Sequence, residues 1–412
     1  MPNFNNNCFI NASLQALFCL EPVQNIFEMI GSKYLRFTKN EEEFEPLYIL
    51  LAYGGILFQG KCDQSSLKQL AETLLDHLST RKVINIENWL RGYTLGGQHD
   101  THEFIMGLND YVDKSYSVLD SLKMKRDDIL YTSILSDVFK IEGVEITSCG
   151  QHYKDNRKCV HGILTLCPEV PFIEMIQSYF NYRVGDSWCQ DCYKSKGEKT
   201  CVYKQFSMES SPTVLGLVIS RNQYGWKNQK FTEIEETFDL YEIIQGQFMP
   251  KQKKKVIYKL ASMILHCGGF VNLGHYVTIS KNSFNQTWYK FDDQFVTALT
   301  DFEVQNMLLD KSKLADQGTP VMLFFKKTEE TTISYLESRK SSKTESSLAS
   351  LNTAGKFLDR ERLQESLSSI EILQSDEEII KDDVDQVEKL MSRSLSITAS
   401  MGIYLFLLFL LL

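Results

Sequence analysis

The sequence changes character after Lys327, and this change limits which part of the chain can form a packed core. Upstream of it, helical and strand-like patterns alternate without a long low-complexity break. Residues 328–394 instead hold 13 serines, 15 acidic and 9 basic residues, and only two aromatic residues. A segment of this composition buries too little apolar surface to offset the entropy lost on ordering. We therefore expect a folded body at residues 1–327, followed by an acidic, Ser-rich linker at residues 328–394.

The net charge of the chain lies mostly in this linker. The whole chain has 44 basic and 53 acidic residues, a formal charge of −9, and the linker carries −6 of it. The body is therefore nearly neutral and lacks the excess of lysine and arginine that phosphate-backbone binding requires. We expect no nucleic-acid partner.

Part of the linker has helical periodicity. Four apolar residues follow an i, i+4, i+7, i+11 pattern: Ile380, Val384, Val387 and Met391. This pattern predicts an amphipathic helix or a short coiled coil. A solvated, charged helix is the alternative.

The C-terminal segment is uncharged and strongly apolar. Residues 395–412 end in GIYLFLLFLLL, and Lys389 and Arg393 precede them. Such a segment is at the short end of what crosses a bilayer core of roughly 30 Å. It predicts a C-terminal transmembrane helix, and because the N-terminus does not resemble a secretory signal, this tail anchor would leave the body in the cytoplasm. The alternative is an apolar helix that docks on the body.

The body mixes two kinds of pattern. Leu14, Leu17 and Phe18 recur at helical spacing after a run of asparagines, which predicts a helix that begins close to Cys8. Residues 203–224 and 258–295 show short β-branched and aromatic runs separated by turn residues, which predicts antiparallel strands. The expected fold class is α+β.

Cys8 is the most informative of the ten cysteines. A chain without a secretory signal is expected in a reducing compartment, where cysteines are buried residues, metal ligands or nucleophiles rather than disulfides. At a helix N-terminus, the helix dipole and the unpaired backbone N–H groups lower a thiol pKa and can hold an oxyanion. Taken alone, a cysteine is more often a small buried apolar residue, so a nucleophile requires a base nearby.

A base and its partner are predicted near residue 283. Segments 275–280 and 287–291 have strand-like patterns on either side of the loop KNSFNQ. A hairpin centred on this loop places His275 opposite Asp292. A carboxylate beside an imidazole holds its tautomer and stabilises the imidazolium, which predicts a nucleophile, base and orienting carboxylate in Cys8, His275 and Asp292. Without Cys8, a surface His–Asp pair would be the simpler interpretation.

Two short motifs predict a metal site. A CxxH motif in SCGQH and a CxxC motif in WCQDC can together place four ligands around a tetrahedral Zn²⁺, and a closed site of this kind is structural. The predicted ligands are Cys149, His152, Cys189 and Cys192. Cys159 or His161 is an alternative ligand, and a region without metal is the competing interpretation.

Four segments in order carry a resemblance to a known family. They are NFNNNCFINASLQ at 3–15, QHDTHEF at 98–104, His266 with GHY at 274–276 and WYKFDD at 288–293, and PVMLFF at 320–325. The chain resembles the ubiquitin-specific proteases, which are papain-like cysteine deubiquitinases with fingers, palm and thumb. The resemblance spans residues 3–326. Asn5 stands where the family has a glycine, and asparagine tolerates the positive φ of such a turn better than most residues.

The resemblance implies a fold, a reaction and partners. It implies a papain-like fold with a fingers insertion at roughly 140–215 that contains the zinc ligands. It makes Cys8 the nucleophile, His275 the base, Asp292 the orienting residue and Asn3 an oxyanion-hole side chain. The implied reaction is cleavage after the C-terminal glycine of ubiquitin on conjugated proteins.

Two questions stay open at this point. Asp293 is a second carboxylate beside the predicted triad, and it either assists or is simply solvated. The function also has two alternatives, which are a catalytically impaired ubiquitin-binding scaffold and a protease for a ubiquitin-like modifier.

Overall fold

A computed structural model describes residues 3, 6–38, 99–124, 131–223, 226–244, 254–270, 273–310 and 317–332. They all belong to one unit, Met1–Glu337. The predicted linker helix and the predicted anchor lie outside the described residues, as does Gln98 of the second motif. Within the described part of the chain, no helix has both the length and the apolar character needed to cross a bilayer.

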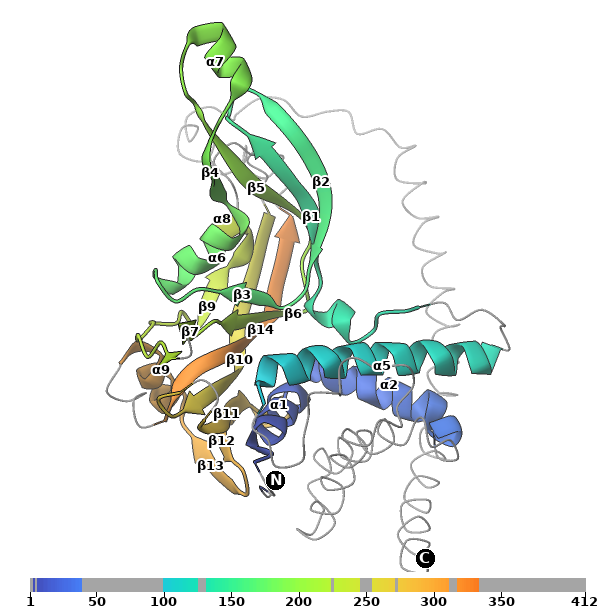
Figure 1. The fold of residues 1–412 in the computed structure, drawn as a ribbon. Helices are drawn as coiled ribbons and strands as arrows, with labels where there is room; N and C mark the ends of the chain where they lie inside the picture. The colour runs from blue at the N-terminus through green and yellow to red at the C-terminus, as the bar shows by residue number, and fades with distance from the viewer. Residues whose placement is uncertain are drawn as a thin grey trace, which may run out of the picture. The chain divides into compact units, whose positions relative to one another are not determined.

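The body is built on an eight-stranded sheet (Figure 1). Its strand order is β13-β12-β11-β10-β14-β6-β3, and β9 pairs with β10 beside this path. All neighbours are antiparallel except β3 and β6, which are parallel. The strands are β3 (Leu164–Leu166), β6 (Val214–Ile219), β9 (Thr237–Asp239), β10 (Lys254–Cys267), β11 (His275–Lys281), β12 (Trp288–Asp292), β13 (Phe295–Leu299) and β14 (Thr319–Thr332).

A four-stranded antiparallel sheet extends away from the larger one and carries helix α7 at its far end (Figure 1). Its order is β2-β1-β5-β4. The strands are β1 (Ile141–Ser148), β2 (Tyr153–His161), β4 (Tyr182–Trp188) and β5 (Cys201–Ser210). The predicted fingers insertion is therefore interrupted, because β3 returns to the eight-stranded sheet. A small separate hairpin joins β7 (Asn222–Gln223) and β8 (Trp226–Lys227).

Helices cover both faces of the eight-stranded sheet. Alternate residues of β14 enter different apolar clusters, Met322 and Phe324 on one face and Leu323 and Phe325 on the other. Helices α1, α2 and α5 pack on the first face, whereas α6, α8 and α9 pack on the second. The helices are α1 (Cys8–Phe18), α2 (Glu21–Thr38), α5 (Thr101–Met124), η3 (Ser136–Phe139), α6 (Phe172–Phe180), α7 (Gln190–Lys196), α8 (Leu240–Ile244) and α9 (Asp301–Leu309).

Helix α1 is the central helix of this fold. It begins at Cys8, as the sequence pattern predicts, and every one of its 11 residues is buried. The Thr278 hydroxyl on β11 donates to the carbonyl oxygen of Ala12 at 2.7 Å. This bond and the surrounding packing fix the start of α1 relative to β11 and β12.

The β11–β12 hairpin forms as predicted, but its register differs by two residues. Thr278 pairs with Phe291, so Asp292 faces Val277 rather than His275. The turn begins one residue later than expected because Asn282 closes it: its N–H donates to the carbonyl of Thr287 at 2.9 Å, and its side chain accepts from loop N–H groups. His275 and Asp292 are therefore diagonal neighbours on one face, which is still within reach of long side chains.

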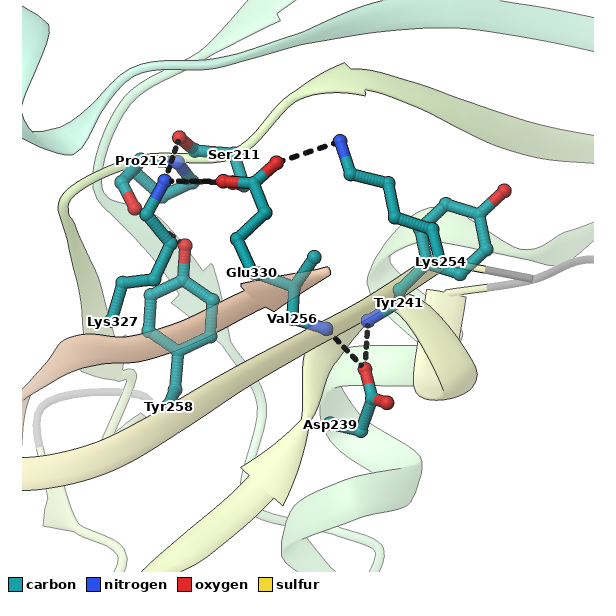
Figure 2. Close-up of polar contacts among 9 residues, drawn as sticks. All are labelled: Ser211, Pro212, Asp239, Tyr241, Lys254, Val256, Tyr258, Lys327 and Glu330. Carbon is teal, nitrogen blue, oxygen red and sulfur yellow. Dashed lines mark hydrogen bonds and ion pairs between the residues drawn. The ribbon is translucent and has the colours of Figure 1, made fainter. Parts of the chain in front are cut away.

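An ionic network joins the end of β14 to the start of β10 (Figure 2). Glu330 accepts from Lys254 at 2.8 Å, from Lys327 at 2.7 Å and from the Ser211 hydroxyl at 3.0 Å. Burial alone would raise the pKa of Glu330, but these donors outweigh it and hold the pKa at about 2. The network therefore stays ionised at neutral pH and ties β14 to β10 and to the β5–β6 turn.

Candidate active site

Cys8 lies at the first position of α1 and is 2 % exposed. The N-cap residue, Asn7, makes no side-chain capping bond to the first turn. The backbone N–H groups of this turn and the positive end of the helix dipole therefore lie beside the thiol. This is an environment that favours a thiolate and a developing oxyanion.

His275 lies between Cys8 and Asp292. Its Nε2 donates to Oδ1 of Asp292 at 2.7 Å, which leaves Nδ1 to face the thiol. The pKa of His275 is raised to about 9, chiefly by its hydrogen bond with Cys8. Burial opposes this rise, while the bond to Asp292 and the charge of Asp293 add to it. The contacts of His275 with Cys8 and Asp292 therefore favour its imidazolium form.

Asp292 is held from both sides. Its Oδ2 lies 3.5 Å from Nζ of Lys290, on the same face of β12. The lysine therefore steadies the oxygen that His275 does not use. The sequence carries a signal for this contact, because the position of Lys290 two residues before Asp292 in a strand places both on one face.

The role of Asp293 could not be decided from the sequence. Its backbone has φ of 51°, and its carboxylate accepts from Nδ2 of Asn3 and from Nδ2 of Asn11, both at 2.8 Å. Its Oδ2 also lies 3.9 Å from Nε2 of His275. The predicted oxyanion residue, Asn3, is thus attached to the triad region through Asp293.

His266, the upstream histidine of the third motif, has a different environment. It is 3 % exposed and its ring lies 4.6 Å from that of Tyr276. Burial, together with the charges of Lys227 and His275, lowers its pKa to about 4. The imidazole of His266 is therefore uncharged at neutral pH, and it lines a polar pocket next to β11.

A pocket of about 330 Å³ lies beside β11, the strand that begins at His275. It is lined by the start of α5, the end of β6, β10 and β11. Asp100 and Glu103 supply negative charge, and Arg221 and Lys227 supply positive charge. The second motif therefore contributes residues 99–103 to a polar pocket beside β11.

The four predicted metal ligands lie together at the far end of the four-stranded sheet. Cys149 and His152 are in the β1–β2 turn, Cys189 is the N-cap of α7, and Cys192 lies within α7. Their ligand atoms all lie within 4.8 Å of one another. The alternative ligands are elsewhere: His161 contacts the hydroxyl of Tyr179 at 3.2 Å.

The spacing of these atoms fits a tetrahedral metal. Nδ1 of His152 lies 3.7, 3.6 and 3.4 Å from the sulfurs of Cys149, Cys189 and Cys192, and the sulfurs of Cys149 and Cys192 are 3.6 Å apart. Bond lengths of about 2.3 Å for Zn–S and about 2.0 Å for Zn–N require ligand separations of about 3.5–3.8 Å. These four of the six ligand separations match a tetrahedral zinc site.

Comparison with known proteins decides the family. The sequence model described as ubiquitin carboxyl-terminal hydrolase matches residues 1–325. The chain belongs to the ubiquitin carboxyl-terminal hydrolase family. This agrees with the motif resemblance to ubiquitin-specific proteases.

Relatives within the hydrolase family are distant and much longer. Ubiquitin carboxyl-terminal hydrolase 36 of Drosophila ananassae is 24 % identical over 321 residues, which cover 74 % of this chain and 27 % of the relative. The Drosophila virilis protein of the same name is 26 % identical over 324 residues, covering 74 % and 24 %. The chain thus spans about a quarter of the length of these curated relatives.

Solved structures show the same hydrolase fold. The SAGA DUB module Ubp8/Sgf11/Sus1/Sgf73 bound to monoubiquitin matches with a TM-score of 0.61 at 18 % identity, covering 80 % of this chain and 69 % of the other. The module bound to ubiquitin aldehyde matches with a TM-score of 0.59 at 18 % identity, covering 80 % and 70 %. The predicted α+β fold class is confirmed.

Proposed function

We propose that this protein is a thiol-dependent hydrolase that cleaves the bond after the C-terminal glycine of ubiquitin on protein conjugates. One observation carries the proposal: Cys8 is the first residue of a buried helix, and the imidazole whose pKa Cys8 raises most, that of His275, is held by Asp292 at 2.7 Å. Membership of the hydrolase family supports ubiquitin as the modifier.

The reaction follows from the positions of these groups. The Cys8 thiolate attacks the carbonyl of the terminal glycine, and the oxyanion is held by backbone N–H groups at the start of α1 and by the amide of Asn3. The C–N bond then breaks as His275 protonates the leaving amine. In the second half, His275 removes a proton from water, which attacks the thioester, and the sulfur leaves as thiolate.

Reaction with a ubiquitin-based electrophilic probe tests the proposal directly. The full chain should form a covalent adduct with ubiquitin that mass spectrometry maps to Cys8, and matched probes built on ubiquitin-like modifiers should react more slowly. Binding of ubiquitin without an adduct would indicate the scaffold alternative. Faster reaction with another modifier would indicate a protease for that modifier.

The pH dependence of turnover should reflect the ionisation of His275. Because its pKa is raised to about 9, kcat/KM for a ubiquitin fluorogenic amide should fall as the pH rises through about 9, where the imidazolium needed by the leaving amine is lost. The Asp292→Asn variant replaces the carboxylate whose hydrogen bond raises this pKa, so its alkaline limb should move to lower pH. Stopped assays from pH 6 to 10 measure both profiles. Asp186→Asn, an exposed change on β4, is the control, and an unmoved limb in Asp292→Asn would contradict the assignment.

We also propose that the metal is Zn²⁺ in a structural site. Three thiolates and one imidazole are the donor set that zinc favours, and a site with four protein ligands has no open position for substrate. The metal would be held by Cys149, His152, Cys189 and Cys192 and would fix α7 to the β1–β2 turn.

We further propose that residues 395–412 attach the protein to a membrane with the catalytic body in the cytoplasm. The support is the uncharged, apolar composition of this segment and the basic residues before it. After carbonate extraction of cell membranes, the full chain should stay in the pellet, and a chain ending at Lys389 should be released. Release of the full chain would contradict the anchor.

A further inference from the structure

Three asparagines at four-residue spacing form a closed ring of hydrogen bonds with Asp293. The backbone N–H of Asn7 donates to Oδ1 of Asn3 at 3.2 Å, and Nδ2 of Asn7 donates to Oδ1 of Asn11 at 3.2 Å. Both acceptor residues then donate from Nδ2 to Asp293, Asn3 to Oδ2 and Asn11 to Oδ1, each at 2.8 Å. Asn7 is thus the double donor of the ring and Asp293 its double acceptor.

The chemistry of the ring fixes the orientation of both amides. A backbone N–H can only donate and a carboxylate can only accept. The side chain of Asn3 therefore satisfies both neighbours only with its oxygen toward Asn7 and its nitrogen toward Asp293. The same holds for Asn11 as long as Asn7 presents its amide nitrogen.

The ring has a buried half and an exposed half. Asn7 and Asn11 are 2 % and 3 % exposed, and the Asp293 side chain is 13 % exposed, whereas Asn3 lies at the surface. Asn7 is the N-cap of α1, and Asn11 lies in its first turn. They can therefore hold Asp293, which in turn holds the one exposed member.

Rigid placement of Asn3 matters for the proposed reaction. The Nδ2 group of Asn3 has two hydrogens, one of which is given to Asp293. The second hydrogen is available for an oxyanion formed at Cys8, and such a donor is most effective when it is oriented before the reaction.

We propose that Asn7 and Asn11 are positioning residues that set the orientation of the Asn3 amide through Asp293. This inference rests on the proposed hydrolase function. It also gives a role to Asn7, the last asparagine of the run before Cys8.

The variant Asn7→Asp tests the ring without changing side-chain size. Its carboxylate cannot donate to Asn11, so the Asn11 amide must turn its nitrogen toward the new carboxylate and its oxygen toward Asp293. We expect kcat for a ubiquitin fluorogenic substrate to fall about 10²-fold with KM nearly unchanged, as for loss of one oxyanion donor. Asn181→Asp, which removes a remote bond to the Ile244 carbonyl, should leave both constants unchanged.

A double-mutant cycle separates positioning from general destabilisation. If Asn7 acts through Asn3, the double variant Asn3→Ala/Asn7→Asp should lie within about twofold of the slower single variant. Effects that multiply would overturn the inference, because they would mean that Asn7 acts independently of Asn3.

The orientation of the Asn3 amide can also be tested by NMR spectroscopy, without measuring turnover. In the ¹⁵N-labelled full chain, the Asn3 side-chain amide signal, identified by its loss in Asn3→Ala, should shift in Asn7→Asp but not in Asn181→Asp. An unmoved signal would overturn the inference. If the wild type fails to hydrolyse any ubiquitin substrate, the proposed function fails, and this signal alone decides the inference.

Discussion

Replacing Cys8 by alanine should reduce hydrolysis of a ubiquitin fluorogenic substrate by at least about 10⁴-fold. The change removes the sulfur that forms the thioester in the proposed reaction, and loss of a nucleophile leaves just the rate that binding and the oxyanion donors supply. Cys8 is 2 % exposed within α1, and alanine is a good helix former of smaller volume. Stability should therefore change little, and the affinity for ubiquitin, measured by calorimetry, should be retained.

Two further variants sharpen this test. Cys167→Ala removes an exposed thiol and should leave turnover unchanged. His275→Ala should cost nearly as much as Cys8→Ala, and the double variant should be no slower than either, because the two residues act as a unit. Turnover that survives in Cys8→Ala would mean that another thiol, or another mechanism, performs the reaction.

The parts of the site that could be predicted are those in which a reactive side chain lies at the start of a helix or beside the loop of a hairpin. A polar run followed by helical periodicity placed Cys8 at a helix start, and two strand patterns around a loop placed His275 near Asp292. The register error of two residues arose because periodicity shows where strands are, whereas the side chain of Asn282 decides where the turn begins. An error of two residues keeps side chains on the same face, so the interaction was preserved.

The contacts that could not be predicted from the sequence join distant segments. Asp293 meets Asn3 across 290 positions of the chain, and no local pattern encodes that pairing. The contact between Asn7 and Asn11 did have a signal in the sequence, because residues four apart lie on the same face of a helix. The positive φ of Asp293 had no such signal, because it depends on the tight turn between β12 and β13.

The zinc proposal carries the second large prediction. The double variant Cys189→Ser/Cys192→Ser should lose about one zinc per chain by elemental analysis. Its Tm should fall by about 10 °C or more, because a structural metal contributes folding free energy directly. Cys159→Ser/Cys167→Ser removes the same number of thiols outside the cluster and should keep the metal.

The reason to expect so large an effect is the composition of the core at this end of the molecule. The apolar cluster there consists of Cys149, Cys189, Cys192 and Val202, with Val184 packed against it. The ligands themselves thus make up most of that core, and so small a cluster cannot hold α7 and the β1–β2 turn without a cross-link. Hydrogen exchange should therefore accelerate in α7 and β4 of the double variant, while α1 and β11 keep their protection. Unchanged exchange in α7 after complete loss of zinc would show that this end folds unaided, and the structural role of the metal would then be wrong.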